Sequence, residues 1–124
     1  SPHKLLAQPA IIFNRKDGLQ DLFLSQQFGL QAPQYPRHFV PAVDAFESAL
    51  ASGMGWGMVH ELHLSARSGR LPLVEMLPGS TVDVPLYWHH WAREPASAQR
   101  LTVAVKLAAR ALGKLDVSSS ANGC

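Results

Sequence analysis

The chain has 124 residues, of which 47% are hydrophobic and 16% charged, a balance typical of one globular domain with a buried core. The net charge is +2, but the eleven Lys and Arg residues form no basic run, which gives little support to nucleic-acid binding by this segment. A single cysteine, Cys124, excludes an internal disulfide framework and fits a reducing cytoplasm. No stretch is apolar over the roughly 18 residues that a membrane span needs. Because the chain starts at Ser1 without an initiator Met or a signal peptide, we expect a piece of a longer cytoplasmic protein.

The order of the predicted elements indicates an α/β domain with a mainly parallel sheet. Short apolar or alternating runs predict strands over residues 10–13, 38–40, 55–59, 71–77 and 82–88. Apolar stripes at helical spacing predict helices over residues 3–7, between 17 and 29, between 44 and 53, over 60–68 and over 95–112. Pro72 and Pro85 favour edge positions for the last two strands. Residues 114–124 have the composition of a disordered tail.

The strongest local signals lie in the stretch from 43 to 59, VDAFESALASGMGWGMV. Asp44 and Glu47 have the spacing of a capping box with an acidic cap, and Gly53 stands where a left-handed residue ends a helix. The glycines beside Trp56 would let another backbone or a ligand come close. The N–H groups of the helix start suit a small anion such as a carboxylate. The alternative is an ordinary αβ unit whose helix start binds only water.

Four of the six histidines form two clusters, His60 with His63 and His89 with His90. Residues three apart share a helix face, so His60 and His63 could bind one metal ion. The run is one residue short of the HExxH spacing and has no third ligand, which favours two surface histidines. If 89 and 90 extend a strand, one of them would face the interior. No nucleophile motif, P-loop or dinucleotide fingerprint is present, so the sequence gives no support to an enzyme.

The three tryptophans, Trp56, Trp88 and Trp91, are most simply core or interface anchors. If a pocket exists, Trp56 and Trp88 could form walls for an aliphatic or cationic ligand arm. Asp44 and Asp83 could pair with a ligand cation, although a surface salt bridge is the commoner role of an acidic residue.

Three ordered motifs resemble the effector-binding domain of LysR-type transcriptional regulators: PAIIFNRKDGLQDLFL, FVPAVDAFESALASGMGWGMV and VDVPLYWHHW. Within that family, LYWHHW resembles the subfamily that controls lysine and arginine export and senses these amino acids. The resemblance covers residues 7–112. One departure is His60, where this subfamily usually has proline, and it affects the expected turn after the 55–59 strand.

The resemblance implies a lobe of the periplasmic-binding-protein-like (type 2) fold. Residues 1–80 would form the second lobe of the effector domain, and residues 81–113 would form the return strand and helix that complete the first lobe. DNA would be bound only through a winged helix-turn-helix that is missing here. The resemblance further implies a homo-oligomer (dimer or tetramer), no cofactor and no contact with a membrane.

The resemblance also implies a site for a small-molecule effector, a basic amino acid such as lysine or arginine, in the cleft between the lobes. The implied site residues are Asn14, Arg15, Asp17, Val43, Asp44, Phe46, Met58, Trp88 and His89. Closure of the cleft on the ligand would bias one lobe arrangement. The acidic Asp44 at a helix start suits the ligand's cationic arm better than its carboxylate. Two alternatives are a solute-binding lobe of a transport system and a metal-dependent hydrolase that uses the histidine clusters.

Overall fold

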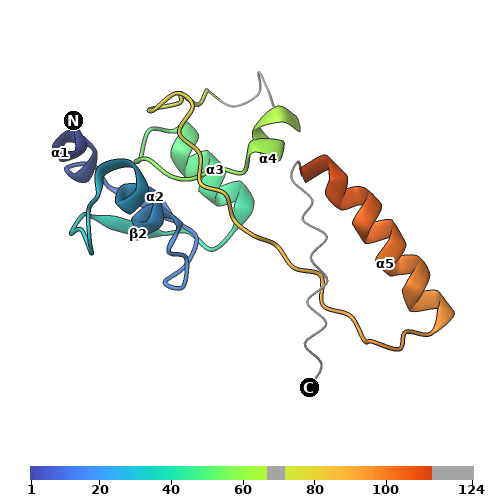
Figure 1. Cartoon of the computed structure of the whole chain (residues 1–124). Coiled ribbons are helices and arrows are strands. Elements are labelled where there is room, and N and C mark those ends of the chain that lie inside the picture. Colours follow the sequence, from blue (N-terminus) through green and yellow to red (C-terminus); the bar gives the residue numbers. More distant parts are fainter. Residues whose placement is uncertain (67–71, 113–124) are drawn as a thin grey trace. The chain divides into compact units, whose positions relative to one another are not determined.

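The computed structural model describes residues 1–66 and 72–112, and the fold is given for these residues (Figure 1). The elements are α1 (Pro2–Leu6), β1 (Ala10–Ile12), α2 (Leu19–Phe28), β2 (Arg37–Phe39), α3 (Val43–Ala51), α4 (Glu61–Ala66), α5 (Ala96–Ala109) and the 3-10 helix η1 (Arg110–Leu112). The chain divides into two compact units, Ser1–Val84 and the remainder from residue 85. The expected end of the 60–68 helix, the start of the 71–77 strand and the 114–124 tail fall outside the described residues.

The sheet of the first unit is parallel, as predicted. β1 pairs with β2 in a register that joins Ala10 to Arg37 and Ile12 to Phe39. On its other side β1 meets Trp56 through a parallel bridge, in which the Ile11 N–H donates to the Trp56 carbonyl oxygen at 2.7 Å. β1 is therefore central, and its three residues are at most 3% exposed, which confirms a strand buried on both faces for residues 10–12. Phe13, which the prediction included, lies outside β1 and is 37% exposed.

The core consists of two layers because successive strand residues point to opposite faces of a sheet. Ala10 and Ile12 of β1 contribute to one cluster of buried side chains, together with Phe23, Leu24, Tyr35 and Trp56. Ile11 contributes to the other, with Phe46 and Ala49 of α3. Each face of β1 is thus covered by a helix, which is the arrangement that an α/β sheet requires.

The helix ends follow the glycines, as predicted. Gly29 ends α2 with φ 67°, and Gly53 follows α3 with φ 78°. Beyond α3, the Gly53 N–H donates to the Leu50 oxygen at 3.0 Å and the Met54 N–H donates to the Ala49 oxygen at 3.1 Å. This pair of bonds is the Schellman motif, which satisfies two carbonyl groups at the end of a helix.

The predicted capping box at the start of α3 is wrong. The N-cap is Ala42, no side chain caps the helix, and Asp44 lies within its first turn. Glu47 is 3% exposed, and its Oε1 lies 2.9 Å from Nε2 of His63 on α4. α3 begins at Val43, before Asp44, and Phe46 is buried against Ile11 of β1. The Glu47 side chain joins α3 to α4 and does not reach back to the helix start.

Three of the predicted strands are wrong within the described residues. The 55–59 strand is reduced to the single bridge at Trp56, because β1 offers a ladder of only three residues and glycines flank the tryptophan. No strand forms over 72–77 or 82–88. Pro72 and Pro85 lack the N–H that a ladder needs, and a strand also needs an available sheet edge as its partner. A turn forms at 78–80, with the Ser80 N–H donating to the Leu77 oxygen at 3.1 Å.

The longest predicted helix is confirmed as α5, followed by the 3-10 helix η1. Pro95 is its N-cap, one residue outside the first turn. The apolar stripe is open: Leu101, Val103 and Leu107 are 56%, 58% and 54% exposed, whereas Thr102 is 6% exposed. Among the described residues, no helix combines the length and the apolar character needed to cross a membrane.

Candidate functional site

The carboxyl edge of the sheet brings together the loop after β1 and the loop after β2. Ile12 and Phe39 are register partners at the ends of β1 and β2, and the Val40 N–H donates to the Ile12 oxygen at 2.8 Å. The loops over residues 13–17 and 40–42 therefore leave the sheet at the same edge. In open parallel sheets, ligands bind outside the carboxyl ends of the strands. Five of the predicted site residues belong to this edge: Asn14, Arg15, Asp17, Val43 and Asp44.

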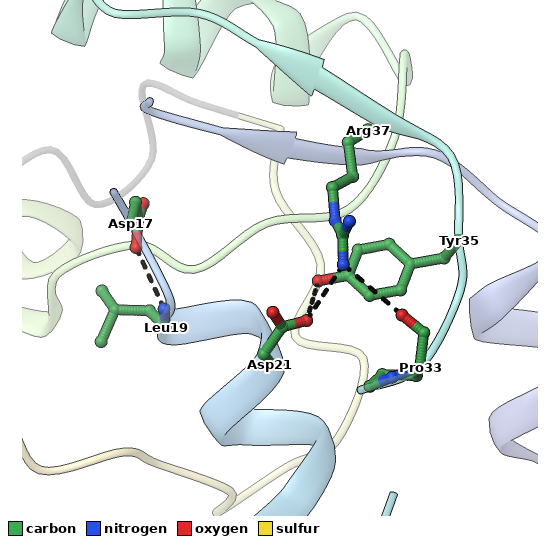
Figure 2. Close-up of polar contacts among 6 residues, drawn as sticks. All are labelled: Asp17, Leu19, Asp21, Pro33, Tyr35 and Arg37. Atoms are coloured by element: carbon green, nitrogen blue, oxygen red, sulfur yellow. Dashed lines mark hydrogen bonds and ion pairs between the residues drawn. The ribbon is translucent and has the colours of Figure 1, made fainter. Parts of the chain in front are cut away.

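The loop after β1 is shaped by its own polar side chains. Oδ1 of Asn14 accepts the Lys16 N–H at 2.9 Å, and the Asn14 carbonyl oxygen accepts the Asp17 N–H at 3.1 Å. Oδ1 of Asp17 accepts the Leu19 N–H at the start of α2, at 3.1 Å (Figure 2). The N-cap of α2 is Gly18, so Asp17 binds the helix start from one residue outside the cap. These bonds fix the loop backbone from which Arg15 projects.

Arg15 links the loop after β1 to the end of β2. Its guanidinium carbon lies 5.5 Å from the centre of the Phe39 ring, the last residue of β2. A cation over an exposed aromatic face is worth about 0.5–1 kcal/mol, enough to bias the arginine toward this position. The arrangement leaves a positive group and a partly exposed aromatic ring at the carboxyl edge of the sheet.

The start of α3 supplies the opposite charge. Val43 and Asp44 are exposed in its first turn, and Asp44 is the acidic residue of that turn. Phe46, one turn further on, is 8% exposed and packs with Ile11 and Ala49. Its side chain therefore belongs to the core beneath the loops. The edge thus carries a cation from one loop and an anion from the adjacent helix start.

Met58 follows the Trp56 bridge and is only partly buried. It lines a cavity of about 640 Å³, whose other walls include Trp56, Leu50, Leu64 and Val74. None of the polar loop residues at the carboxyl edge lines this cavity. Met58 is the one predicted site residue that lines it.

Trp88 and His89 belong to the second unit, and their part in an effector site stays a prediction. The Trp88 ring is 45% exposed, and its Nε1 donates to Oγ1 of Thr102 on α5 at 3.1 Å. His89 and His90 are both exposed and extend no strand, so the condition under which one of them would face the interior is not met. Trp91 is 82% exposed and is no core anchor in this unit, in contrast to Trp56 in the first.

The known proteins that resemble this chain in sequence belong to one family of regulators. No family model matches the chain. It is 41% identical over 87 residues to the HTH-type transcriptional regulator ArgP of Pseudomonas aeruginosa strain UCBPP-PA14, covering 70% of this chain and 28% of that protein. It is 36% identical over 111 residues to the HTH-type transcriptional regulator LysG of Mycobacterium tuberculosis strain H37Rv, covering 84% of this chain and 34% of that protein. The chain belongs to the LysR-type transcriptional regulators.

Solved structures place this LysR-type chain in the effector-binding part of the family. Full-length LysG of Corynebacterium glutamicum with bound effector Arg matches with a TM-score of 0.62 and 32% identity, over 81% of this chain and 34% of that one. The C-terminal domains of a LysR family protein from Agrobacterium tumefaciens C58 match with a TM-score of 0.51 and 38% identity, over 64% and 38%. The expected α/β, type 2 periplasmic-binding-protein-like fold is confirmed. The chain spans roughly a third of the length of these relatives.

A polar network of the LysR-type chain, which the sequence did not reveal, joins α2 to β2 (Figure 2). The Tyr35 hydroxyl donates to Oδ1 of Asp21 at 2.6 Å, and Arg37 donates to the same oxygen at 3.3 Å and to the Pro33 oxygen at 3.4 Å. The Arg37 guanidinium also lies 4.2 Å from the centre of the Tyr35 ring. Burial and the Asp21 hydrogen bond raise the pKa of Tyr35, and the hydrogen bond to Tyr35 raises the pKa of Arg37. The network lies where β2 begins, at the end of the strand opposite Phe39.

The histidines of the LysR-type chain have local partners. His63 pairs with Glu47, and Nδ1 of His60 accepts the Leu62 N–H at 3.2 Å. Nδ1 of His90 lies 3.0 Å from Oε1 of Glu94. Across residues 1–66 and 72–112, no three His, Cys, Asp or Glu side chains gather as metal ligands would. The His63–Glu47 contact joins α4 to α3, whereas the His60 and His90 contacts are local.

Proposed function

We propose that this chain is the effector-sensing portion of a cytoplasmic LysR-type regulator that responds to a basic amino acid such as arginine or lysine. The observation that carries the proposal is the presence of opposite charges at one sheet edge, Arg15 from the loop after β1 and Asp44 from the first turn of α3. A basic amino acid carries a carboxylate and a cationic arm, so it presents the complementary pair. The similarity to a LysG structure with bound Arg supports the same ligand class.

In this proposal the two charges have different roles. Arg15, steadied by the Phe39 ring, takes the carboxylate of the ligand, because a guanidinium matches carboxylate geometry with two parallel hydrogen bonds. Asp44 takes the cationic arm, since an acidic residue in the first turn offsets the attraction of the helix start for an anion. Asn14 and Asp17 act indirectly, through the loop backbone that their side chains fix.

Regulation would follow from differential binding. A ligand that contacts this lobe and the lobe completed by the rest of the protein favours the closed arrangement of the two, by as much as its affinities for the open and closed states differ. DNA would be bound by a winged helix-turn-helix outside this chain. Closure would then reorient the DNA-binding arms of a homo-oligomer.

The test is calorimetry of the full-length regulator with matched ligands. We expect Asp44→Asn to weaken arginine binding about tenfold, or about 1.4 kcal/mol, while leaving any weak binding of the neutral analogue citrulline unchanged. Arg15→Gln should weaken arginine about tenfold but leave argininamide, which lacks the carboxylate, unchanged.

Glu61→Gln is the control for this test, because it also removes an acidic group from the first turn of a helix, α4. It should bind arginine as the wild type does. Wild-type affinity for arginine and lysine in both Asp44→Asn and Arg15→Gln would contradict the proposed site.

A further inference from the structure

Two contacts between an arginine and an aromatic ring lie at opposite ends of β2. Where the strand begins, the guanidinium carbon of Arg37 lies 4.2 Å from the centre of the Tyr35 ring. Where the strand ends, the guanidinium carbon of Arg15 lies 5.5 Å from the centre of the Phe39 ring. The two contacts have the same chemistry, but they differ in what else each guanidinium binds.

The contact at the start of β2 is completed by other groups of the protein. Arg37 donates to Oδ1 of Asp21 at 3.3 Å and to the Pro33 oxygen at 3.4 Å (Figure 2). Oxygen atoms of the chain itself therefore occupy the hydrogen-bonding side of this guanidinium. Its role is structural, because it holds the start of β2 against α2.

The contact at the end of β2 leaves its guanidinium unoccupied. Arg15 is exposed, and across residues 1–66 and 72–112 its side chain has no hydrogen bond or ion pair. Attraction to an aromatic ring satisfies none of the five N–H donors of a guanidinium with an oxygen acceptor. The donors of Arg15 are thus available to an anion, whereas those of Arg37 are taken by the protein.

Both supports of the Arg15 side chain are fixed by the fold. Phe39 ends β2 as the register partner of Ile12, and its ring is 42% exposed. The loop that carries Arg15 is held by Oδ1 of Asn14, which accepts the Lys16 N–H at 2.9 Å. A long side chain that is already restrained loses less conformational freedom when a ligand binds, and this preorganisation raises affinity.

We propose that Phe39 is a positioning residue for effector recognition, because its ring holds the Arg15 guanidinium at the carboxyl edge of the sheet with its donors free for the α-carboxylate of the ligand. This inference rests on the proposed function, in which Arg15 takes that carboxylate, and it adds the ligand class. A guanidinium binds a planar carboxylate with two parallel hydrogen bonds, so the site selects free amino acids over their α-amides. Phe39 acts through Arg15 and does not touch the ligand.

The experiment is calorimetry of the full-length regulator with arginine and with argininamide, which lacks the carboxylate. Phe39→Leu keeps an apolar side chain but removes the aromatic face. It should weaken arginine about threefold, the size of one exposed cation–π contact, and leave argininamide unchanged. Phe39→Tyr keeps the aromatic face and should bind both ligands as the wild type does. Phe39→Met repeats the test if Phe39→Leu does not fold.

A double-mutant cycle separates positioning from a direct or a merely structural role of the ring. In an Arg15→Gln background there is no cation to hold, so Phe39→Leu should cause no further loss of arginine affinity. A ring that contacted the ligand, or that only maintained the fold, would add its own loss to that of Arg15→Gln. Arg37→Gln is the matched control at the other end of β2 and should leave the preference for arginine over argininamide unchanged.

Two outcomes overturn the inference without deciding the proposed function. Wild-type preference for arginine over argininamide in Phe39→Leu would show that Arg15 needs no positioning. Equal losses from Phe39→Leu with and without Arg15→Gln would show that the ring acts independently of Arg15. In both cases weak arginine binding by Arg15→Gln and Asp44→Asn would still support the proposed site, and wild-type binding by these two variants would contradict it.

Discussion

Tyr35 shows how one residue serves the core and a polar network at once. Its ring packs with Trp56, with 5.8 Å between ring centres, while its hydroxyl reaches Asp21 on α2. Burial raises the pKa of the phenol most strongly, and the Asp21 carboxylate raises it further through the hydrogen bond. Arg37 acts in the opposite direction and lowers the pKa, because a cation favours the phenolate.

Because the effects that raise it outweigh the effect of Arg37, the pKa of Tyr35 is predicted to lie above the ordinary tyrosine value of 10.0. Between pH 10.0 and the native pKa, the unfolded chain has lost a proton that the native chain keeps, so the free energy of unfolding falls as the pH rises through this window. Ultraviolet titration of the phenolate, with Tyr35→Phe subtracted to isolate the signal, should give a midpoint above 10.0. A midpoint at or below the ordinary value would contradict the network.

Single residues also mark the limit of prediction from sequence. Asp17 has a local partner, the Leu19 N–H, which is only two residues away. Glu47 has capping-box spacing, yet it pairs with His63, sixteen positions further along the chain. A sequence pattern over a few residues cannot predict a partner that only tertiary packing brings within hydrogen-bond distance.

At the scale of elements, the close approach of the Trp56 segment to β1 depends on Gly55. A Cβ at Gly55 would overlap the Pro9 carbonyl oxygen and lie 3.0 Å from its carbon and 3.3 Å from Cδ1 of Ile11. The Pro9 oxygen also accepts the Trp56 N–H at 3.0 Å, so the backbone cannot retreat without losing that bond. The glycine is therefore required by sterics, as the sequence pattern around Trp56 indicated.

We predict that Gly55→Ala lowers the free energy of unfolding by about 1–3 kcal/mol, the usual cost of overpacking. Gly18→Ala is the matched control, since Gly18 has φ −101° and nothing lies within 4 Å of a Cβ there. Its effect should stay within about 0.5 kcal/mol, as for an exposed surface change. Urea unfolding followed by Trp56 fluorescence measures both. Equal stabilities of the two variants would show that the segment can shift away from β1.

The predicted strands over 72–77 and 82–88 have a shared reason for not forming. The 72–77 and 82–88 stretches have strand-like composition, but a strand is stable only when an edge pairs with it. β1 already pairs on both sides, with β2 and with Trp56. Strand propensity is a property of the segment, whereas an available edge is a property of the fold.

At the scale of the whole molecule, the open apolar face of α5 is the feature that most needs a partner. Val103 and Leu107 lie four residues apart on one helix face and are both more than half exposed. The chain spans roughly a third of the length of its relatives. Contiguous exposed apolar surface favours association.

We predict that the 124-residue chain by itself associates at micromolar concentration and binds a hydrophobic dye. Val103→Gln combined with Leu107→Gln should reduce both effects, because it removes the apolar side chains without breaking the helix. Arg100→Gln combined with Arg110→Gln changes the polar side of the same helical segment and should leave both effects in place. Sedimentation velocity and dye fluorescence measure the outcome. A monomeric chain that binds no dye would contradict this prediction.

The sequence by itself determined the α/β class, the parallel sheet, the buried strand at residues 10–12, the glycine helix ends and the burial of Trp56. These follow from periodicity and backbone freedom, which act over a few residues. Only the tertiary structure decided that Glu47 pairs with His63, that Tyr35, Asp21 and Arg37 form one network, and that Thr102 tethers Trp88. Each of these depends on residues far apart in sequence, and a side chain's partner is set by which surfaces the packed core brings within hydrogen-bond distance.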